Sequence, residues 1–190
     1  MSKQLAFLVD SKKCIGCYSC AMACKNQYHQ EPGVKWRDLK PLPGEIYPHR
    51  DRAFYSLACN HCASPVCVSV CPVSAYTKRE TDGIVVHDAE KCIYCKACIN
   101  SCSYGAAKDN KIQERAEKCS FCVERVDKGL LPACVQGCPT KALTMIELDK
   151  VNSDNIEQYP KGFEKHTKLN PSTRFVFSET PKLVISDTDA

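Results

Sequence analysis

Residues 92–102 read Cys-Ile-Tyr-Cys-Lys-Ala-Cys-Ile-Asn-Ser-Cys, which places four cysteines at the spacing C-x2-C-x2-C-x3-C. The same spacing returns at residues 14–24. Two looser quartets, C-x2-C-x4-C-x3-C and C-x2-C-x11-C-x3-C, occupy residues 59–71 and 119–138. These four quartets account for all 16 cysteines of the chain, so the fold must be organised around them.

Three chemistries use many cysteines, and the spacing separates them. Disulfides favour cysteines that close long loops in an oxidising compartment, whereas these cysteines lie two residues apart without a secretion signal. Structural zinc takes two cysteine pairs separated by a dozen or more residues, an arrangement that only residues 119–138 approach. The spacing therefore favours iron–sulfur clusters over both.

The compact quartet matches a cubane 4Fe–4S cluster. Three thiolates on a short loop each hold one iron, and the fourth points away to a different cluster, as in bacterial ferredoxins. In that pattern a proline follows the fourth cysteine. Pro72 and Pro139 stand there after the second and fourth quartets, whereas Lys25 and Ser103 follow the first and third. Sixteen thiolates predict four 4Fe–4S clusters as the cofactors.

The flanking residues divide the quartets into two kinds. The first and third follow an apolar stretch and Asp-x-x-Lys, while the second and fourth end in Cys-Val-x-x-Cys-Pro-x-x-Ala. The second and third quartets therefore form a ferredoxin unit in chain order, with strands at 75–78 and 84–87 around an Asp-Gly turn. The fourth and first form the same unit with its halves swapped, so strand 142–147 should pair with strand 5–9.

This repeat predicts which thiols share a cluster, because the fourth cysteine of each quartet completes the cluster of its paired quartet. We name the predicted metal ligands the first to fourth thiol sets, in this order: Cys14, Cys17, Cys20 and Cys138; Cys59, Cys62, Cys67 and Cys102; Cys92, Cys95, Cys98 and Cys71; Cys119, Cys122, Cys134 and Cys24. No catalytic residue and no further cofactor-binding residue is predicted, since no nucleophile–base pair, phosphate loop or dinucleotide fingerprint occurs.

The remaining composition excludes several classes of protein. With 44% hydrophobic and 25% charged residues, the 190-residue chain is neither a disordered tail nor a membrane span. The apolar run from Leu5 to Val9 is far shorter than the roughly 18 residues of a membrane helix, and it does not form a signal peptide. A net charge of +4 is too weak to argue for a nucleic-acid partner.

Several residues outside the thiol sets have two interpretations. His61 can tune a cluster by hydrogen bonding, although a packed histidine is favoured. Trp36 with Arg37 is a candidate interface anchor, with a buried tryptophan as the alternative. Basic residues crowd the cluster loops, either as counter-charges for the clusters or as a solvated face. They are Lys12, Lys13, Lys78, Arg79, Lys91, Lys96, Lys118 and Arg125.

The order of the quartets resembles the four-cluster electron-transfer (beta) subunit of the dimethyl sulfoxide reductase and polysulfide reductase family of molybdopterin oxidoreductases. The resemblance covers roughly residues 3–147. It is also carried by Asp10-x-x-Lys13-Cys14-Ile15-Gly16-Cys17, Cys59-Asn60-His61-Cys62 and Cys119-Ser120-Phe121-Cys122-x-x-Arg125. Related nitrate reductase subunits replace one cysteine by tryptophan and hold a 3Fe–4S cluster, whereas this chain has cysteine in all sixteen places.

The resemblance implies partners and a location. The chain would relay electrons between an integral membrane, quinol-oxidising anchor subunit and a large molybdopterin-containing catalytic subunit of an anaerobic respiratory reductase. It would be membrane-associated through these partners, on the cytoplasmic or the exported face, without inserting into the membrane itself. The alternative is a polyferredoxin-like subunit of a formate dehydrogenase, hydrogenase or carbon monoxide dehydrogenase system. A third hypothesis is a non-redox scaffold whose clusters serve only the structure.

The expected fold is α+β, with two ferredoxin-like modules, one nested inside the other, and an extended C-terminal arm. Residues 1–24 with 103–149 form the outer module and residues 59–102 the inner one, each with short helices after its quartets and a two-stranded sheet. Residues 25–58 are an insertion that faces a partner, because such a long connection is unusual without a function. Residues 150–190 are the arm, which is expected to lie on a partner. It carries an apolar alternation at residues 174–177 and another apolar stretch at residues 183–185, which predict short strands.

Overall fold

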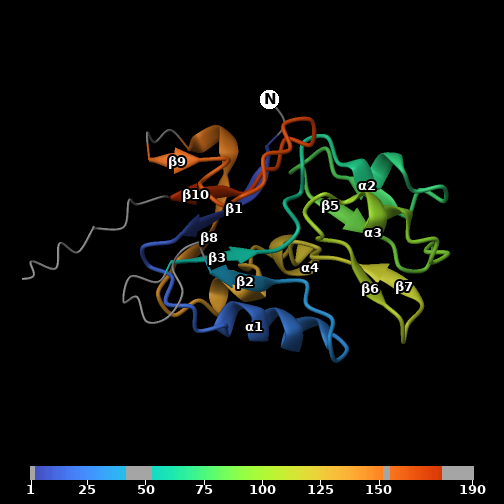
Figure 1. Ribbon diagram of the computed structural model, residues 1–190, viewed down its shortest axis with the longest axis horizontal. Helices are drawn as coiled ribbons and strands as arrows, with labels where there is room; N and C mark the ends of the chain where they lie inside the picture. Colours follow the sequence, from blue (N-terminus) through green and yellow to red (C-terminus); the bar gives the residue numbers. More distant parts are fainter. Residues whose placement is uncertain (1–2, 42–52, 152–154, 177–190) are drawn as a thin grey trace, which may run out of the picture.

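The computed structural model describes residues 3–41, 53–151 and 155–176. The helices in these ranges are α1 (Ser19–Tyr28), α2 (Val66–Ser69), α3 (Ala97–Ser101), α4 (Val123–Val126) and α5 (Ala133–Gln136), with a 3-10 turn at Leu148–Lys150. The strands are β1 (Leu5–Asp10), β2 (Asp38–Pro41), β3 (Phe54–Leu57), β4 (Tyr76–Lys78), β5 (Val85–His87), β6 (Lys108–Asn110), β7 (Arg115–Glu117), β8 (Leu143–Glu147), β9 (Ile156–Glu157) and β10 (Arg174–Val176). In Figure 1, β1, β8, β9 and β10 gather at one side of the molecule and β4 to β7 at the other.

The start of the chain forms the interior of the largest sheet. β1 runs antiparallel to β8, with a register from Leu5 opposite Glu147 to Val9 opposite Leu143. Leu5, Phe7 and Val9 share one face of the strand and are all buried. The predicted pairing of residues 5–9 with residues 142–147 is therefore confirmed.

The outer sheet is larger than predicted, because it has four strands in the order β8-β1-β10-β9 instead of two. β10 lies parallel to β1, with Val9 opposite Phe175, and β9 pairs with β10. Phe175 is fully buried, and its ring lies 5.0 Å from Tyr55 and 4.9 Å from Phe163. Residues 155–176 thus cover the free edge of the chain's own sheet, where a partner was expected. Phe177 and residues 183–185, part of the same sequence pattern, lie outside the described residues.

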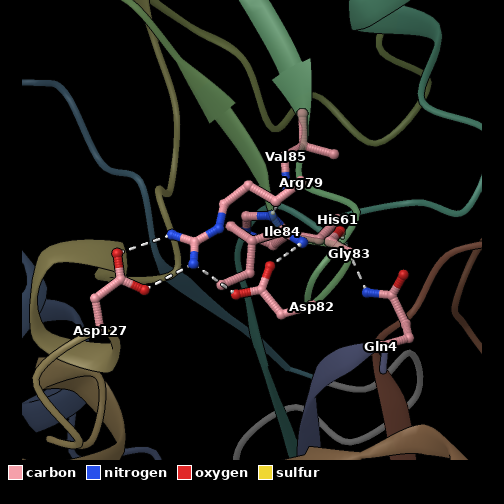
Figure 2. A network of polar contacts seen from close by, with 8 residues as sticks. All are labelled: Gln4, His61, Arg79, Asp82, Gly83, Ile84, Val85 and Asp127. Atoms are coloured by element: carbon pink, nitrogen blue, oxygen red, sulfur yellow. Dashed lines mark hydrogen bonds and ion pairs between the residues drawn. The ribbon is translucent and has the colours of Figure 1, made fainter. Parts of the chain in front are cut away.

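The two-stranded sheet of the inner unit was predicted correctly, as β4 and β5 pair antiparallel from Tyr76 opposite His87 to Lys78 opposite Val85. Its turn is tied to distant segments, as Figure 2 shows. Arg79 binds Asp82 at 3.1 Å and Asp127 of the loop after α4 at 2.7 Å. The Gln4 side chain donates to the Gly83 carbonyl at 3.3 Å. These bonds connect the turn to the residue just before β1 and to the loop after α4.

The helices were expected to follow the cysteine quartets. In the structure they begin inside the quartets instead. α1 starts at Ser19 and carries Cys20 and Cys24, and α3 starts at Ala97 and carries Cys98. Both follow a residue in the left-handed region, Tyr18 and Lys96, which turns the chain sharply enough for the helix to start within the loop. At 10 residues α1 is the longest described helix, and none of the helices in the described ranges is long and apolar enough to cross a membrane.

Residues 25–58 fold onto the chain itself as far as they are described. β2 and β3 form an antiparallel pair, and the half-buried Trp36 packs on Tyr28 with ring centroids 4.6 Å apart. Its indole N–H donates to Glu117 Oε2 at 3.1 Å. Trp36 therefore packs within the chain, which agrees with the alternative interpretation of a buried tryptophan and not with an interface anchor. The partner-facing role of residues 42–52 concerns a stretch outside the described residues.

The contact between α1 and α5 leads to a prediction at Gly137. A Cβ atom added there would lie 2.8 Å from the Cβ of Ala23 and 3.2 Å from a backbone oxygen of α5. Gly137→Ala is therefore expected to push the two helices apart and to destabilise the cluster-loaded protein by about 1–3 kcal/mol. An anaerobic urea titration measures this loss.

Ala23→Gly provides the matched background for that measurement. It removes the atom with which the new methyl group collides, so Gly137→Ala should cost clearly less there than in the wild type. Equal costs in the two backgrounds would show that this contact is not the cause.

Candidate iron–sulfur centres

The first thiol set surrounds a cavity between β1, α1 and the loop after α5. Cys14, Cys17, Cys20 and Cys138 line this space together with apolar side chains such as Val9 and Leu143. Burial raises the pKa of the Cys14 thiol, and the nearby thiols Cys20, Cys138 and Cys17 add to the effect. The late Cys138 therefore lies with the three cysteines that start the chain.

The third thiol set surrounds an equivalent cavity in the inner unit. Cys71, Cys92, Cys95 and Cys98 line this space. Two donors point at its sulfur atoms, because the Tyr76 hydroxyl donates to Cys98 Sγ and the Ala75 amide to Cys71 Sγ, each at 3.3 Å. Again one cysteine of the neighbouring quartet joins three from the compact loop.

The remaining two sets are more deeply enclosed, and each is also drawn together. Burial raises the pKa of the Cys62 thiol to about 12, helped by the other thiols of the second set, Cys59, Cys102 and Cys67. In the fourth set, burial raises the pKa of Cys24 to about 11, helped by Cys134 and Cys122. Burial also raises the pKa of Cys119 well above its usual value, with Cys24 as the thiol that contributes most.

The donor set and its spacing fit a cluster of several irons better than a single ion. All sixteen cysteines are free, so none forms a disulfide. Among the described residues, no three cysteine, histidine or carboxylate side chains converge closely enough to hold one metal ion. In the first and third sets the thiols instead line cavities, as a cubane with an iron at each of four corners requires. Clusters bound in this way accept and release single electrons.

The loops reach this geometry through unusual backbone conformations. Gly16 and Tyr18 have positive φ angles of 69° and 60°, and Tyr94 and Lys96 repeat them at the same offsets with 54° and 60°. Phe121 and Cys122 also lie in this region. A left-handed residue other than glycine costs about 1–2 kcal/mol. The same strain occurs at matching positions of two loops. This indicates that the free energy gained by bringing the thiols together exceeds the cost of the strain.

Two of the eight basic residues assigned to the cluster loops are clear internal cations. Lys118 is buried, and its Nζ donates to the carbonyls of Cys119, at 2.8 Å, and Val85. The partly buried Lys78 Nζ donates to the Cys62 carbonyl at 3.0 Å. Lys12, Lys13 and Lys91 are exposed, which matches the solvated-face interpretation. A third internal cation is Arg37, which was expected with Trp36 to anchor an interface but is 2% exposed. Its closeness to the thiols was not predicted, because it lies in the insertion outside the quartets.

His61 is a packed histidine, as favoured. It is 1% exposed, and its Nδ1 accepts a hydrogen bond from the Val85 amide at 3.0 Å. Burial, and then the charges of Lys118, Lys78 and Arg37, hold its pKa well below the usual value, so the ring is neutral. Its edge meets the ring of Phe121, which is fully buried and stacks on Phe7 at 4.2 Å. Both Phe121 and Tyr18 stand next to a predicted ligand cysteine in the sequence. Phe121 is part of the core, whereas Tyr18 is 43% exposed.

These features define a ferredoxin-type iron–sulfur protein, and comparison with known proteins agrees. Residues 51–148 match the 4Fe-4S dicluster domain family, and residues 7–27 match a 4Fe-4S binding domain. The chain is 38% identical over 159 residues to the B component of the anaerobic dimethyl sulfoxide reductase of Escherichia coli, covering 80% of this chain and 77% of the relative.

Two further relatives carry the names of reductases for other substrates. Identity to the B component of the tetrathionate reductase of Salmonella typhimurium is 42% over 135 residues, covering 70% of this chain and 54% of that protein. Identity to the arsenate respiratory reductase iron–sulfur subunit of Shewanella sp. is 29% over 216 residues, covering 88% and 91%. The chain belongs to the family of iron–sulfur (beta) subunits of the dimethyl sulfoxide reductase type.

The family membership confirms the expected class of function. The chain is a 4Fe–4S electron-transfer subunit of an anaerobic reductase complex, and catalysis belongs to another subunit. The relatives favour this assignment over the polyferredoxin alternative and over a non-redox scaffold.

Proposed function

We propose that the four thiol sets each hold one 4Fe–4S cluster and that the chain relays electrons between a molybdopterin-containing catalytic subunit and a quinol-oxidising membrane anchor subunit. One observation carries the proposal. Cys138 lines the cavity of the first set and Cys71 that of the third, although each belongs to another quartet in the sequence. This exchange of the fourth ligand is what two ferredoxin units require.

The four sets form a line in the order first, fourth, second, third. The Cys20 thiol of the first set contributes to the raised pKa of the buried Cys134 in the fourth. Cys59 of the second set does the same for Cys119 of the fourth. Tyr76, which donates to Cys98 of the third set, also lies near Cys67 of the second. Neighbouring sets thus lie close to one another, which suits stepwise electron transfer.

The two ends of this line are the surfaces that we assign to the partners. Cys17 and Cys95, one thiol from each terminal set, are the exposed cysteines of the chain. Beside them Ile15 is 65% exposed and Ile93 61%. A thiol at the surface, flanked by an exposed apolar side chain, suits a contact through which electrons pass to another protein. Attachment to the membrane is through the anchor subunit.

The nested arrangement belongs to the same proposal. Residues 1–24 with 103–149 are the outer module, residues 59–102 the inner module, residues 25–58 the insertion and residues 150–190 the arm. The pairing of β1 with β8 supports the outer module. A separate small core of Tyr76, Val85, Cys98, Ala107 and Ala116 supports an inner unit, although its last two members lie just beyond residue 102.

The test is a comparison of two electron donors to the isolated complex. Cys134→Ser, in the middle of the line, should abolish quinol-driven reduction of the complex's substrate, with dimethyl sulfoxide, tetrathionate and arsenate as the probes. Reduction driven by a small viologen that reaches the catalytic subunit directly should persist, which shows that the complex has assembled. Ser69→Ala, a surface hydroxyl bonded to the Val66 carbonyl, is the control. Undiminished quinol-driven turnover in Cys134→Ser would contradict the relay.

A further inference from the structure

The core contains a guanidinium group that lies among thiols. Arg37, just before β2, is 2% exposed and is one of the largest fully buried side chains. Its Nη1 donates to the Ser56 carbonyl and to Ser56 Oγ, both at 3.0 Å. Its Cζ lies 4.3 Å above the centre of the Phe7 ring. These contacts hold the group in one position.

This arrangement is incomplete for a buried cation. Within the described residues, Arg37 Nε and Nη2 are buried without an oxygen or nitrogen acceptor, and the side chain that offers the guanidinium a further, weaker hydrogen bond is the Cys134 thiol. A buried unpaired charge is strongly destabilising, and each unsatisfied buried donor adds to that cost. Such a residue is stable in a core when a bound group that is not part of the polypeptide supplies the missing acceptors and negative charge.

Four thiols lie near Arg37, and as metal-bound thiolates they would carry the negative charge that a buried guanidinium needs nearby. Burial lowers the pKa of the guanidinium, but nearby cysteines outweigh burial and hold it above its ordinary value: Cys134, Cys119, Cys20 and Cys24. Cys20 belongs to the first thiol set and the other three to the fourth. Arg37 therefore lies between two neighbouring sites, both of which receive a ligand from α1.

A serine links the guanidinium to one of these thiols directly. Ser56 Oγ, which accepts from Arg37 Nη1, lies 3.2 Å from Cys20 Sγ. Ser56 is itself 3% exposed, so water does not replace these contacts. The first set is thus coupled to Arg37 through a hydrogen-bonded bridge, and the fourth set through the contact of the guanidinium with the Cys134 thiol.

We propose that Arg37 is the shared internal counter-cation of the first and fourth cluster sites and raises the reduction potentials of both. This inference rests on the proposed ligand sets. Reduction adds one electron to a site and makes it more negative, so a fixed positive charge nearby favours the reduced state. The guanidinium stays protonated throughout, so no proton accompanies the electron. The N–H groups at Nε and Nη2 remain available to donate hydrogen bonds to the clusters that we propose at these two sites.

The test is a redox titration of the purified, cluster-loaded protein, followed by electron paramagnetic resonance. In Arg37→Gln, two of the four clusters should show at least a tenfold smaller equilibrium constant for one-electron reduction, which is about 59 mV. The other two should change less than threefold. Arg37→Lys keeps the charge, so it should restore most of the shift.

Arg174→Gln is the matched control. This guanidinium is also partly buried in the outer sheet, but it donates to backbone carbonyls, among them Pro171 at 2.7 Å, and no thiol contributes to its pKa. In this variant the equilibrium constant for one-electron reduction of each of the four clusters should stay within twofold of its wild-type value. Unchanged potentials in Arg37→Gln, with iron content intact, would overturn the proposal.

Ser56→Ala keeps the test decisive if Arg37→Gln does not retain its iron. It removes the bridge to Cys20 with little change in volume, and it should lower the reduction equilibrium of one cluster about threefold. No shift in Ser56→Ala would then count against Arg37. A wild-type protein without four reducible clusters would instead contradict the proposed function, so the two failures are distinguishable.

Discussion

Removing iron from the cluster-loaded protein is expected to abolish its cooperative unfolding transition. Six of the nineteen described residues that form the larger buried core are cysteines: Cys20, Cys24, Cys59, Cys119, Cys134 and Cys138. Without metal, the thiols of the first and third sets line unfilled cavities, and the strained loops lose what holds them. Since binding of metal to such sites is coupled to folding, the apo-chain should be largely unfolded.

Anaerobic chelation followed by thermal melting under circular dichroism measures this effect. The cluster-loaded protein should melt in one sharp transition and the apo-chain should show none. Adding iron, sulfide and reductant back should restore the transition, which excludes damage by the chelator. A sharp apo-protein transition at a similar temperature would show that the polypeptide core suffices alone.

The second large effect is expected from paired cysteine substitutions that test the exchange of ligands. If Cys14 and Cys138 hold the same cluster, Cys14→Ser and Cys138→Ser should each alter the same one of the four cluster signals. The double variant should then lose no more than either single one, because the shared site is already broken. Cys119→Ser with Cys138→Ser is the matched comparison and should disturb two signals.

Iron content and electron paramagnetic resonance of these variants decide between the two arrangements. Grouping by nearness in the sequence would assign Cys138 to Cys119, Cys122 and Cys134. In that case the Cys119/Cys138 pair would behave as one site and the Cys14/Cys138 pair as two. The structure supports the first arrangement, because Cys138 and not Cys119 borders the cavity of Cys14.

The sequence predicted the parts of this molecule that repeat. The spacing of the quartets indicated iron–sulfur clusters, and the repeated flanks predicted that residues 142–147 return to residues 5–9, as β8 and β1 do. Repeats are informative because one half indicates what the other half must do. The prolines after Cys71 and Cys138 likewise marked the second and fourth quartets as the same kind of half.

The parts without a repeat were not predictable in this way. β10 was recognised as an apolar alternation, but three residues do not reveal which edge they join. β6, with the sequence Lys-Asp-Asn, has no apolar alternation at all, and the hairpin that it forms with β7 was missed. Arg37 resembles a surface residue in the sequence, because nothing near it there shows that four thiols surround it in space.

The position of β1 inside its sheet has a consequence for biosynthesis. Ser11 Oγ, just after β1, donates to the Val176 carbonyl, 165 residues further along the chain. At about 5–20 residues per second, the ribosome releases that partner roughly 8–33 s after β1 itself. The proposed second and third sites draw all their ligands from residues 59–102 and are ready earlier. We therefore expect the inner clusters to be inserted earlier during translation, and the outer ones to wait until residues up to 176 have been made.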